Sequence, residues 1–155
     1  MKLFVLSLLF ACLDVTTCWS EEWAPPPQEF EQIALHLGNC ISDAVTAEAP
    51  ACIDKATQAW EGLLQKEYDK LMDRLLPPRQ KLLRDSQTEW LRFKYFELKR
   101  IDDFYGETKG TKVAIARSQA VNALVRERAI SMRIASAALD GTYMDDWWYP
   151  LFREH

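Results

Sequence analysis

The sequence predicts an all-α protein: a small antiparallel helical bundle of three long or medium helices, a short N-terminal helix and one disulfide. Apolar residues recur at intervals of three and four along three long segments, which is the spacing of one helix face. Proline and glycine mark the ends of these segments. No segment alternates apolar and polar residues over enough positions to suggest a strand, and no long internal repeat is visible.

The first two predicted helices flank a segment that contains two cysteines. The run from Pro25 to Pro27 cannot continue a helix and favours an extended lead-in. A short helix is expected over residues 28–37, with Gly38 and Asn39 as its stop signals. Pro50 then opens a long helix. The apolar stripe of this long helix consists of Ile53, Ala56, Trp60, Leu64, Tyr68, Leu71 and Leu75.

Two further helices complete the predicted bundle. Pro77 and Pro78 end the long helix and permit a tight reversal, so the next helix folds back. The stripe of that third helix is Leu83, Trp90, Phe93, Ile101 and Phe104. After a loop over residues 106–110, a last helix is expected over residues 111–139, closed by Asp140 and Gly141. Its stripe is rich in small residues, which allow a neighbouring helix to approach closely: Val113, Ala116, Ala120, Leu124, Ile130 or Ser131, and Ile134.

The first 20 residues have the layout of a secretory signal peptide. Lys2 precedes an apolar run that ends at Leu13, shorter than the roughly 20 residues of a membrane-spanning helix. We therefore expect cleavage before Glu21 and a periplasmic or secreted product with no stable membrane span. A lipoprotein box that ends at Cys12 is the alternative, although bulky Phe10 stands where a small residue is usual.

The expected organisation has one domain between two terminal segments. It consists of the signal peptide 1–20, a Pro-rich lead-in and short helix 21–38, a helical domain 39–141, and an aromatic and acidic tail 142–155. The leader contains one Lys and one Asp, so the net charge of -4 survives its removal. That charge argues against a nucleic-acid binder, which must neutralise phosphates.

The cysteines predict one disulfide in the exported chain. Loss of the leader removes Cys12 and Cys18 and leaves the pair Cys40 and Cys52 in an oxidising compartment. Two free thiols or a metal site are the alternatives, but a metal needs more ligands and only His36 lies nearby. We therefore expect no metal and no cofactor. Catalysis is not expected either, because no nucleophile elbow, phosphate-binding glycine loop or zinc-protease motif occurs.

Four groups of residues resemble a known family. In chain order they are Cys40, Thr46 and Cys52; Tyr68, Leu71, Met72 and Leu75; Leu83, Arg84, Gln87 and Trp90 with Phe93 and Lys94; and Arg126, Glu127 and Arg128. Over about residues 40–134 the sequence thereby resembles the lysozyme inhibitor LprI-like N-terminal domain of secreted bacterial proteins. We call Gln87, Trp90, Phe93, Lys94, Arg126 and Arg128 the core motif.

The resemblance implies inhibition of a lysozyme or another wall hydrolase by occupation of the enzyme's cleft. Many members carry two more cysteines, at positions that correspond here to Leu98 and Ala120. Their joint absence is expected if those two cysteines pair with each other, which leaves Cys40 with Cys52.

Two segments are candidates for contact with such a partner. The tail concentrates aromatic and acidic side chains of a kind that marks interaction sites: Asp145, Asp146, Trp147, Trp148, Tyr149 and Phe152. Alternatively, these residues cover the end of the bundle. The segment between the cysteines would lose little entropy on binding, because the disulfide orders it beforehand, and its polar candidates are Ser42, Asp43, Thr46 and Glu48. Alternatively, the disulfide only fixes the first helix.

Two further predictions concern polar residues on the helix faces and an alternative function. Gln87, Lys94, Glu97 and Arg128 lie on otherwise apolar helix faces, where an internal network of hydrogen bonds and ion pairs is expected. The alternative to a lysozyme inhibitor is a non-catalytic structural or assembly module of the envelope. Such a module would act through contacts between helices, either in a homo-oligomer or with another envelope protein.

Overall fold

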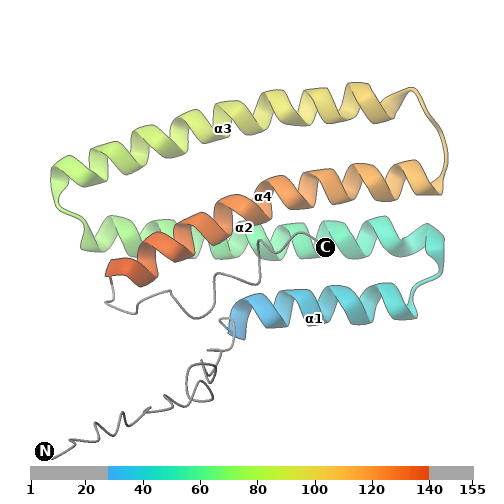
Figure 1. The fold of residues 1–155 in the computed structure, drawn as a ribbon, viewed down its shortest axis with the longest axis horizontal. Coiled ribbons are helices and arrows are strands. Elements are labelled where there is room, and N and C mark those ends of the chain that lie inside the picture. Colours follow the sequence, from blue (N-terminus) through green and yellow to red (C-terminus); the bar gives the residue numbers. More distant parts are fainter. Residues whose placement is uncertain (1–27, 140–155) are drawn as a thin grey trace, which may run out of the picture.

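The computed structural model describes residues 28–139 and confirms an all-α bundle with one disulfide. Its helices are α1 (Gln28–Asp43), α2 (Ala49–Arg74), α3 (Pro77–Gly106) and α4 (Thr111–Leu139). A short 3-10 helix, η2 (Thr46–Glu48), leads into α2. Consecutive helices run antiparallel, with α1 and α3 at the two edges and α2 and α4 between them (Figure 1).

The core is built mainly by α2 and α4. Its buried members are Phe30 of α1, Trp60, Leu63, Leu64 and Leu71 of α2, and Val125, Ala129, Ile130 and Met132 of α4. Small buried residues on α4, among them Ala129, Ser136 and Ala137, allow α2 and α4 to pack closely against each other. A polar link joins the same helices, since the Asn122 side chain donates to Thr57 Oγ1 at 3.0 Å.

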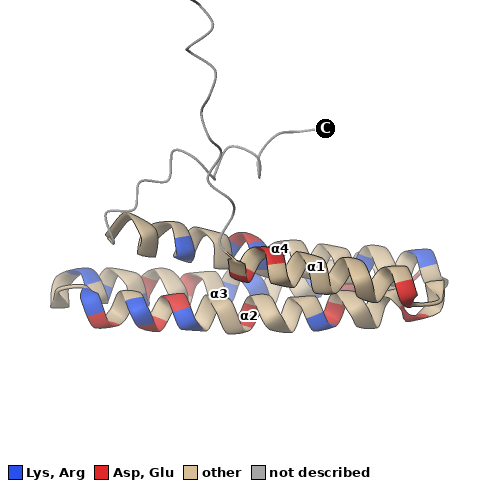
Figure 2. Ribbon diagram, turned by 90° about the horizontal axis from the view of Figure 1, so that it is seen from below, with Lys and Arg blue, Asp and Glu red and all other residues tan. Residues whose placement is uncertain are grey.

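The edge helices contribute much less to this core. Phe30 is the buried residue of α1, and it meets Trp60 edge to face, with ring centroids 5.3 Å apart. Ile101 is the buried residue of α3, while Leu83 and Trp90 are partly buried against the core. Charges of both signs are interspersed along α2 and α3 (Figure 2). Both edge helices therefore keep most of their surface accessible.

The first helix is longer than the sequence predicts. Gly38 and Asn39 do not stop α1, which continues through Cys40 to Asp43. A glycine inside a helix costs about 1 kcal/mol relative to alanine, so it weakens a helix without ending it. Gly110 is the glycine of the described chain with a positive φ, 134°, and its carbonyl accepts the first backbone bonds of α4.

The other boundaries agree with prediction, but two apolar stripes were partly wrong. Pro77 begins α3 directly after the break at Leu75 and Leu76, and α4 spans residues 111–139 as expected. Phe93 and Phe104 are 52% and 71% exposed, because α3 packs on the bundle along a narrow seam. On α4 the buried face is rotated from the predicted one and consists of Ser118, Val125, Ala129, Ile130, Met132, Ser136 and Ala137.

Candidate functional site

The turn between α1 and α2 is fastened at both ends by one disulfide. Cys40 lies in the last turn of α1 and Cys52 in the first turn of α2, with their Cα atoms 5.7 Å apart. The Ala44 amide donates to the Cys40 carbonyl at 3.0 Å, and the Glu48 amide donates to the Val45 carbonyl at 2.8 Å. We call residues 41–48 the stapled turn, since covalent and backbone bonds both order it.

The stapled turn presents an apolar apex between polar groups. Val45 is 65% exposed and Ile41 is 41% exposed. The four predicted candidates Ser42, Asp43, Thr46 and Glu48 are all exposed on this segment. Glu48 is the N-cap residue of α2, yet its side chain makes no capping bond, so its carboxylate stays available. Hydroxyl donors and carboxylate acceptors thus lie beside two accessible aliphatic side chains, of which Val45 is the more exposed.

Four residues of the core motif meet where α3 packs on its neighbours. Arg128 of α4 donates to Gln87 Oε1 at 3.2 Å through Nε and 3.1 Å through Nη2, and its guanidinium lies 5.8 Å from the Trp90 ring centroid. Lys94 Nζ lies 5.5 Å from the same centroid and pairs with Glu61 of α2. Burial lowers the pKa of Arg128 from its ordinary value. The motif is therefore a structural junction of three helices.

The other two residues of the core motif, and Glu97 of the predicted polar network, lie outside this junction. Phe93 points away from the seam, and Arg126 lies over the Trp60 ring at 5.9 Å. Glu97 does not join the expected internal network, because it pairs with Arg100 one turn along the same helix. Its carboxylate accepts two hydrogen bonds from Arg100, which lower the pKa of Glu97. The tail candidates Asp145, Asp146, Trp147, Trp148, Tyr149 and Phe152 lie outside the described residues.

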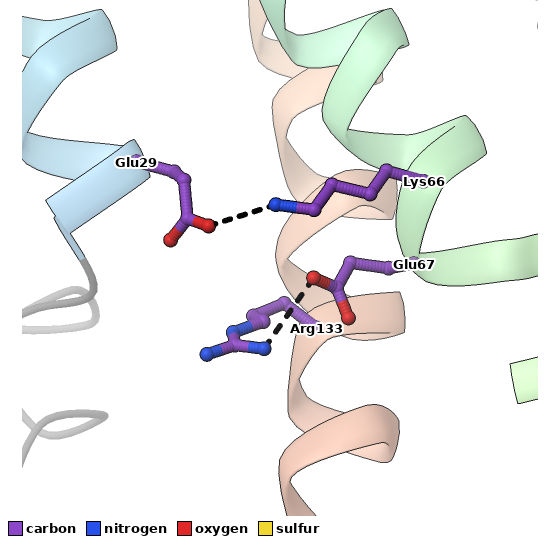
Figure 3. Close-up of polar contacts among 4 residues, drawn as sticks. All are labelled: Glu29, Lys66, Glu67 and Arg133. Carbon is purple, nitrogen blue, oxygen red and sulfur yellow. Dashed lines mark hydrogen bonds and ion pairs between the residues drawn. The ribbon is translucent and has the colours of Figure 1, made fainter. Parts of the chain in front are cut away.

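A second charged group joins α1, α2 and α4 (Figure 3). Lys66 donates to Glu29 at 2.9 Å, which lowers the pKa of Glu29. Beside this exposed pair, Arg133 of α4 reaches Glu67 of α2 at 3.4 Å. Glu67 is 1% exposed, and its Oε2 atom has no hydrogen-bond partner. The predicted apolar stripe missed this buried acid because it took Tyr68 as the stripe member, although Glu67 lies three residues after Leu64 and four before Leu71 on the same helix face.

An open groove of about 610 Å³ runs between α1 and α2. Aliphatic or small side chains, such as Ile33 and Leu37 of α1 and Ala59 and Leu63 of α2, line much of it. Its polar lining consists of Glu29, Gln32, His36, Lys55 and Lys66, and no Phe, Tyr or Trp is among the described residues that line it. The groove therefore offers polar groups to a ligand but, within the described chain, no large aromatic face on which a sugar ring stacks.

The described helices show neither a metal site nor a membrane span. Within residues 28–139, no group of three or more His, Cys, Asp or Glu side chains could hold a metal ion. None of the described helices is both long enough and apolar enough to cross a bilayer. The accessible features of this part of the chain are thus a rigid turn, a groove and two open edge helices.

These features define a small all-helical protein stapled by one disulfide. The family model described as lysozyme inhibitor LprI matches residues 39–131, which is more than half of the chain. The chain therefore belongs to the lysozyme inhibitor LprI family. A search of curated proteins and a search of solved structures each returned no significant match.

Proposed function

We propose that the protein is exported and inhibits a lysozyme by inserting the stapled turn into the enzyme's cleft. The observation that carries this proposal is the exposed apex at Val45, held between α1 and α2 by the Cys40–Cys52 disulfide. A turn that is already ordered loses little conformational entropy when it binds. The family match supports a lysozyme as the partner.

The chemistry of the turn suits the cleft of a glycosidase. Such clefts contain a pair of carboxyl groups on either side of the scissile bond. The hydroxyls of Ser42 and Thr46 can donate hydrogen bonds to carboxylates, and Val45 can displace water between them. Asp43 and Glu48 can meet the basic surface that typical lysozymes present, which speeds association at low salt. No catalytic step on the inhibitor's side is needed.

The two halves of the domain have separate roles in this proposal. The core-motif junction at Trp90 holds α3 and α4 on α2, as the cation contacts of Lys94 and Arg128 show. The stapled turn lies between the end of α1 and the start of α2, whereas the junction contacts α2 near its middle, at Glu61. Substitutions in the junction should therefore reduce stability, while substitutions at the apex should reduce binding alone.

A lysis assay with matched variants tests whether the stapled turn is the inhibitory surface. The rate of lysis of a peptidoglycan suspension would be measured with lysozymes of several classes and increasing amounts of the oxidised chain. We expect Val45→Asp to raise the concentration needed for half inhibition at least tenfold, since an apolar contact becomes a desolvated charge. Leu35→Asp is the control, because Leu35 is similarly exposed at 62% but lies within α1.

The tail provides the competing location. A chain that ends after Tyr143 lacks all six aromatic and acidic tail candidates. If this truncation abolishes inhibition while Val45→Asp leaves it intact, the tail and not the stapled turn enters the cleft. Charge reversal by Asp43→Arg with Glu48→Arg should mainly slow association, whereas the same reversal at exposed Asp73 and Glu127 should not.

A further inference from the structure

The exposed side of α3 carries a stripe with the spacing of a coiled-coil seam. Intervals of four and three residues separate its members, and all of them are exposed in the single chain. Phe93, Phe96 and Phe104 are 52%, 56% and 71% exposed, and Leu82 is 68% exposed. We call this set the α3 stripe: Leu82, Ser86, Glu89, Phe93, Phe96, Arg100 and Asp103, with Phe104 beside its end.

Apart from Ser86, which accepts a hydrogen bond from Arg128 at 3.1 Å, the stripe does not belong to the seam between α3 and its neighbours. At 100° per residue, the seam residues Leu83, Trp90 and Ile101 lie on one face of α3, and the stripe lies roughly a quarter turn or more away. α3 forms one edge of the bundle, with its neighbours on one side (Figure 1). Three exposed phenylalanines on one helix face are more than a monomeric surface ordinarily leaves in water.

We propose that the α3 stripe binds a second copy of this chain in an antiparallel homodimer. A twofold axis midway between Phe93 and Phe96 sets Phe93 of each copy against Phe96 of the other. The same axis sets Glu89 of each copy opposite Arg100 of the other, so two opposite charges meet on both sides of the aromatic centre. The stripe is therefore complementary to itself, as a closed twofold interface requires.

Both charged residues are available for this contact. Arg100 is 62% exposed at its side chain and is held by Glu97 at 2.7 Å, which fixes its position on the helix. Glu89 is exposed and lies on the same side of α3. At the ends of the stripe, Phe104 of one copy falls between Leu82 and Ser86 of the other. A parallel pairing would instead place Glu89 against Glu89 and Arg100 against Arg100, which like charges disfavour.

The size of the stripe indicates a dimer of moderate strength. Leu82 and Phe104 are 22 positions apart, which is about 33 Å of helix. With roughly 100 Å² of exposed area on each aromatic side chain, the two copies would bury on the order of 1,000 Å² together. That area is at the lower limit for specific complexes, so we expect dissociation in the micromolar range.

The antiparallel arrangement gives the dimer two stapled turns that point in opposite directions. The turn between α1 and α2 lies at the same end of the bundle as the α3–α4 connection (Figure 1). Because the two α3 helices run antiparallel, these ends point away from each other. Such a dimer could hold two partner molecules at once. The dimer itself does not depend on the proposed inhibition, and it is measured without any lysozyme.

Sedimentation velocity with charge-swapped variants tests the proposal. The oxidised exported chain would be examined from about 1 to about 100 μM, where we expect a monomer–dimer equilibrium. Glu89→Arg alone and Arg100→Glu alone should each be monomeric, because each places like charges across the axis. An equimolar mixture of the two variants should recover a heterodimer, since both opposed pairs then have opposite charges.

Apolar substitutions provide the second arm. Phe93→Ser with Phe96→Ser should abolish association, whereas Leu91→Ser should leave it unchanged. Leu91 is a matched control because it is 53% exposed but lies on the other side of α3. Circular dichroism would confirm that each variant is folded, and the charge-swap mixture decides the question if the phenylalanine variant is not. A monomeric wild type at 100 μM, or a mixture that stays monomeric, would overturn the proposal.

Discussion

Removal of the disulfide should release α1 while leaving the α2–α4 core folded. α1 contributes one buried residue, Phe30, to the described core, and an isolated helix of this length is marginal in water. Its other attachments include the partly buried Ile33, the exposed Glu29–Lys66 ion pair and the Cys40–Cys52 bond. The perturbation is the double substitution Cys40→Ala with Cys52→Ala.

The expected magnitude follows from the loop that the disulfide closes. A sequence separation of 12 residues corresponds to about 3 kcal/mol of restricted chain entropy in the usual model. Because the disulfide joins α1 to α2, its removal should lower the free energy needed to open α1 locally by most of this amount. Amides of residues 32–43 should then exchange about 100-fold faster, since each 1.4 kcal/mol is a factor of ten.

Hydrogen exchange measured by mass spectrometry resolves the two regions. We expect faster exchange in α1 and the stapled turn, with little change in amides around Leu64 and Val125. The oxidised wild type and the wild type treated with a reductant are the two controls. Equal acceleration in α1 and α4 would contradict this prediction, since it would make α1 an integral part of one cooperative core. Unchanged exchange in α1 would refute it as well.

Three further predictions concern the charged groups and the seam between α3 and α4. Arg133→Ala should destabilise the fold by about 3 kcal/mol in urea unfolding, because it leaves Glu67 buried without its cation. Arg133→Leu combined with Glu67→Leu should restore stability, because neither charge then remains buried. Replacement of Leu98 and Ala120 by cysteine should yield a second disulfide that stabilises the fold by about 3 kcal/mol. The two positions face each other across α3 and α4, because the contacts of Asp102 with Arg117 and of Gln87 with Arg128 lie on either side of them along the helices. Mass spectrometry would detect the bond, and thermal unfolding its effect. Failure to oxidise would contradict the register. The pKa of Glu29 is lowered in the folded state, so Glu29 stabilises the fold above its unfolded value of 4.5, and this contribution is lost as pH falls below that value. Lys66→Ala should therefore reduce the difference in unfolding free energy between pH 6 and pH 3, by less than about 1 kcal/mol because the pair is exposed. An unchanged difference would contradict this assignment.

The sequence predicts helices well here because each boundary has a local cause. Pro50 and Gly110 act on their own backbone, so the starts of α2 and α4 agree with the expectation to within a residue, and the expected break at Pro77 and Pro78 separates α2 from α3. Gly38 misled the prediction of α1, because its effect on a helix is a modest cost that the disulfide at Cys40, two residues later, can outweigh. Composition alone cannot weigh those two contributions.

The faces of the helices were harder to predict, because they depend on which neighbours are present. The apolar residues of α3 cover more than one face, and periodicity cannot tell a seam with α4 from a surface for another molecule. Phe93 and Phe104 were therefore assigned to the core, whereas the structure exposes both. On α4, small residues made close packing predictable, but the rotation of the helix is set by contacts with α2 such as Asn122 to Thr57.

The candidate site was predicted in part. The spacing of the cysteines located the stapled turn and its polar residues, since a disulfide fixes the segment between its ends. The apex at Val45 was missed, because an aliphatic residue in a short loop gives no sign that it will be accessible. The core motif was located by resemblance, and only the geometry around Trp90 shows that four of its members form a structural junction.

Inhibition itself is measured by titrating a lysozyme with the oxidised chain and following the rate of peptidoglycan lysis. Lysozymes of several classes should be compared at one enzyme concentration and one ionic strength. We expect saturable, stoichiometric slowing of at least one class, and loss of that slowing when Val45 is replaced by Asp. Lysis at an undiminished rate in every class, with micromolar folded inhibitor and an intact disulfide, would contradict the proposed inhibition and favour the envelope assembly module.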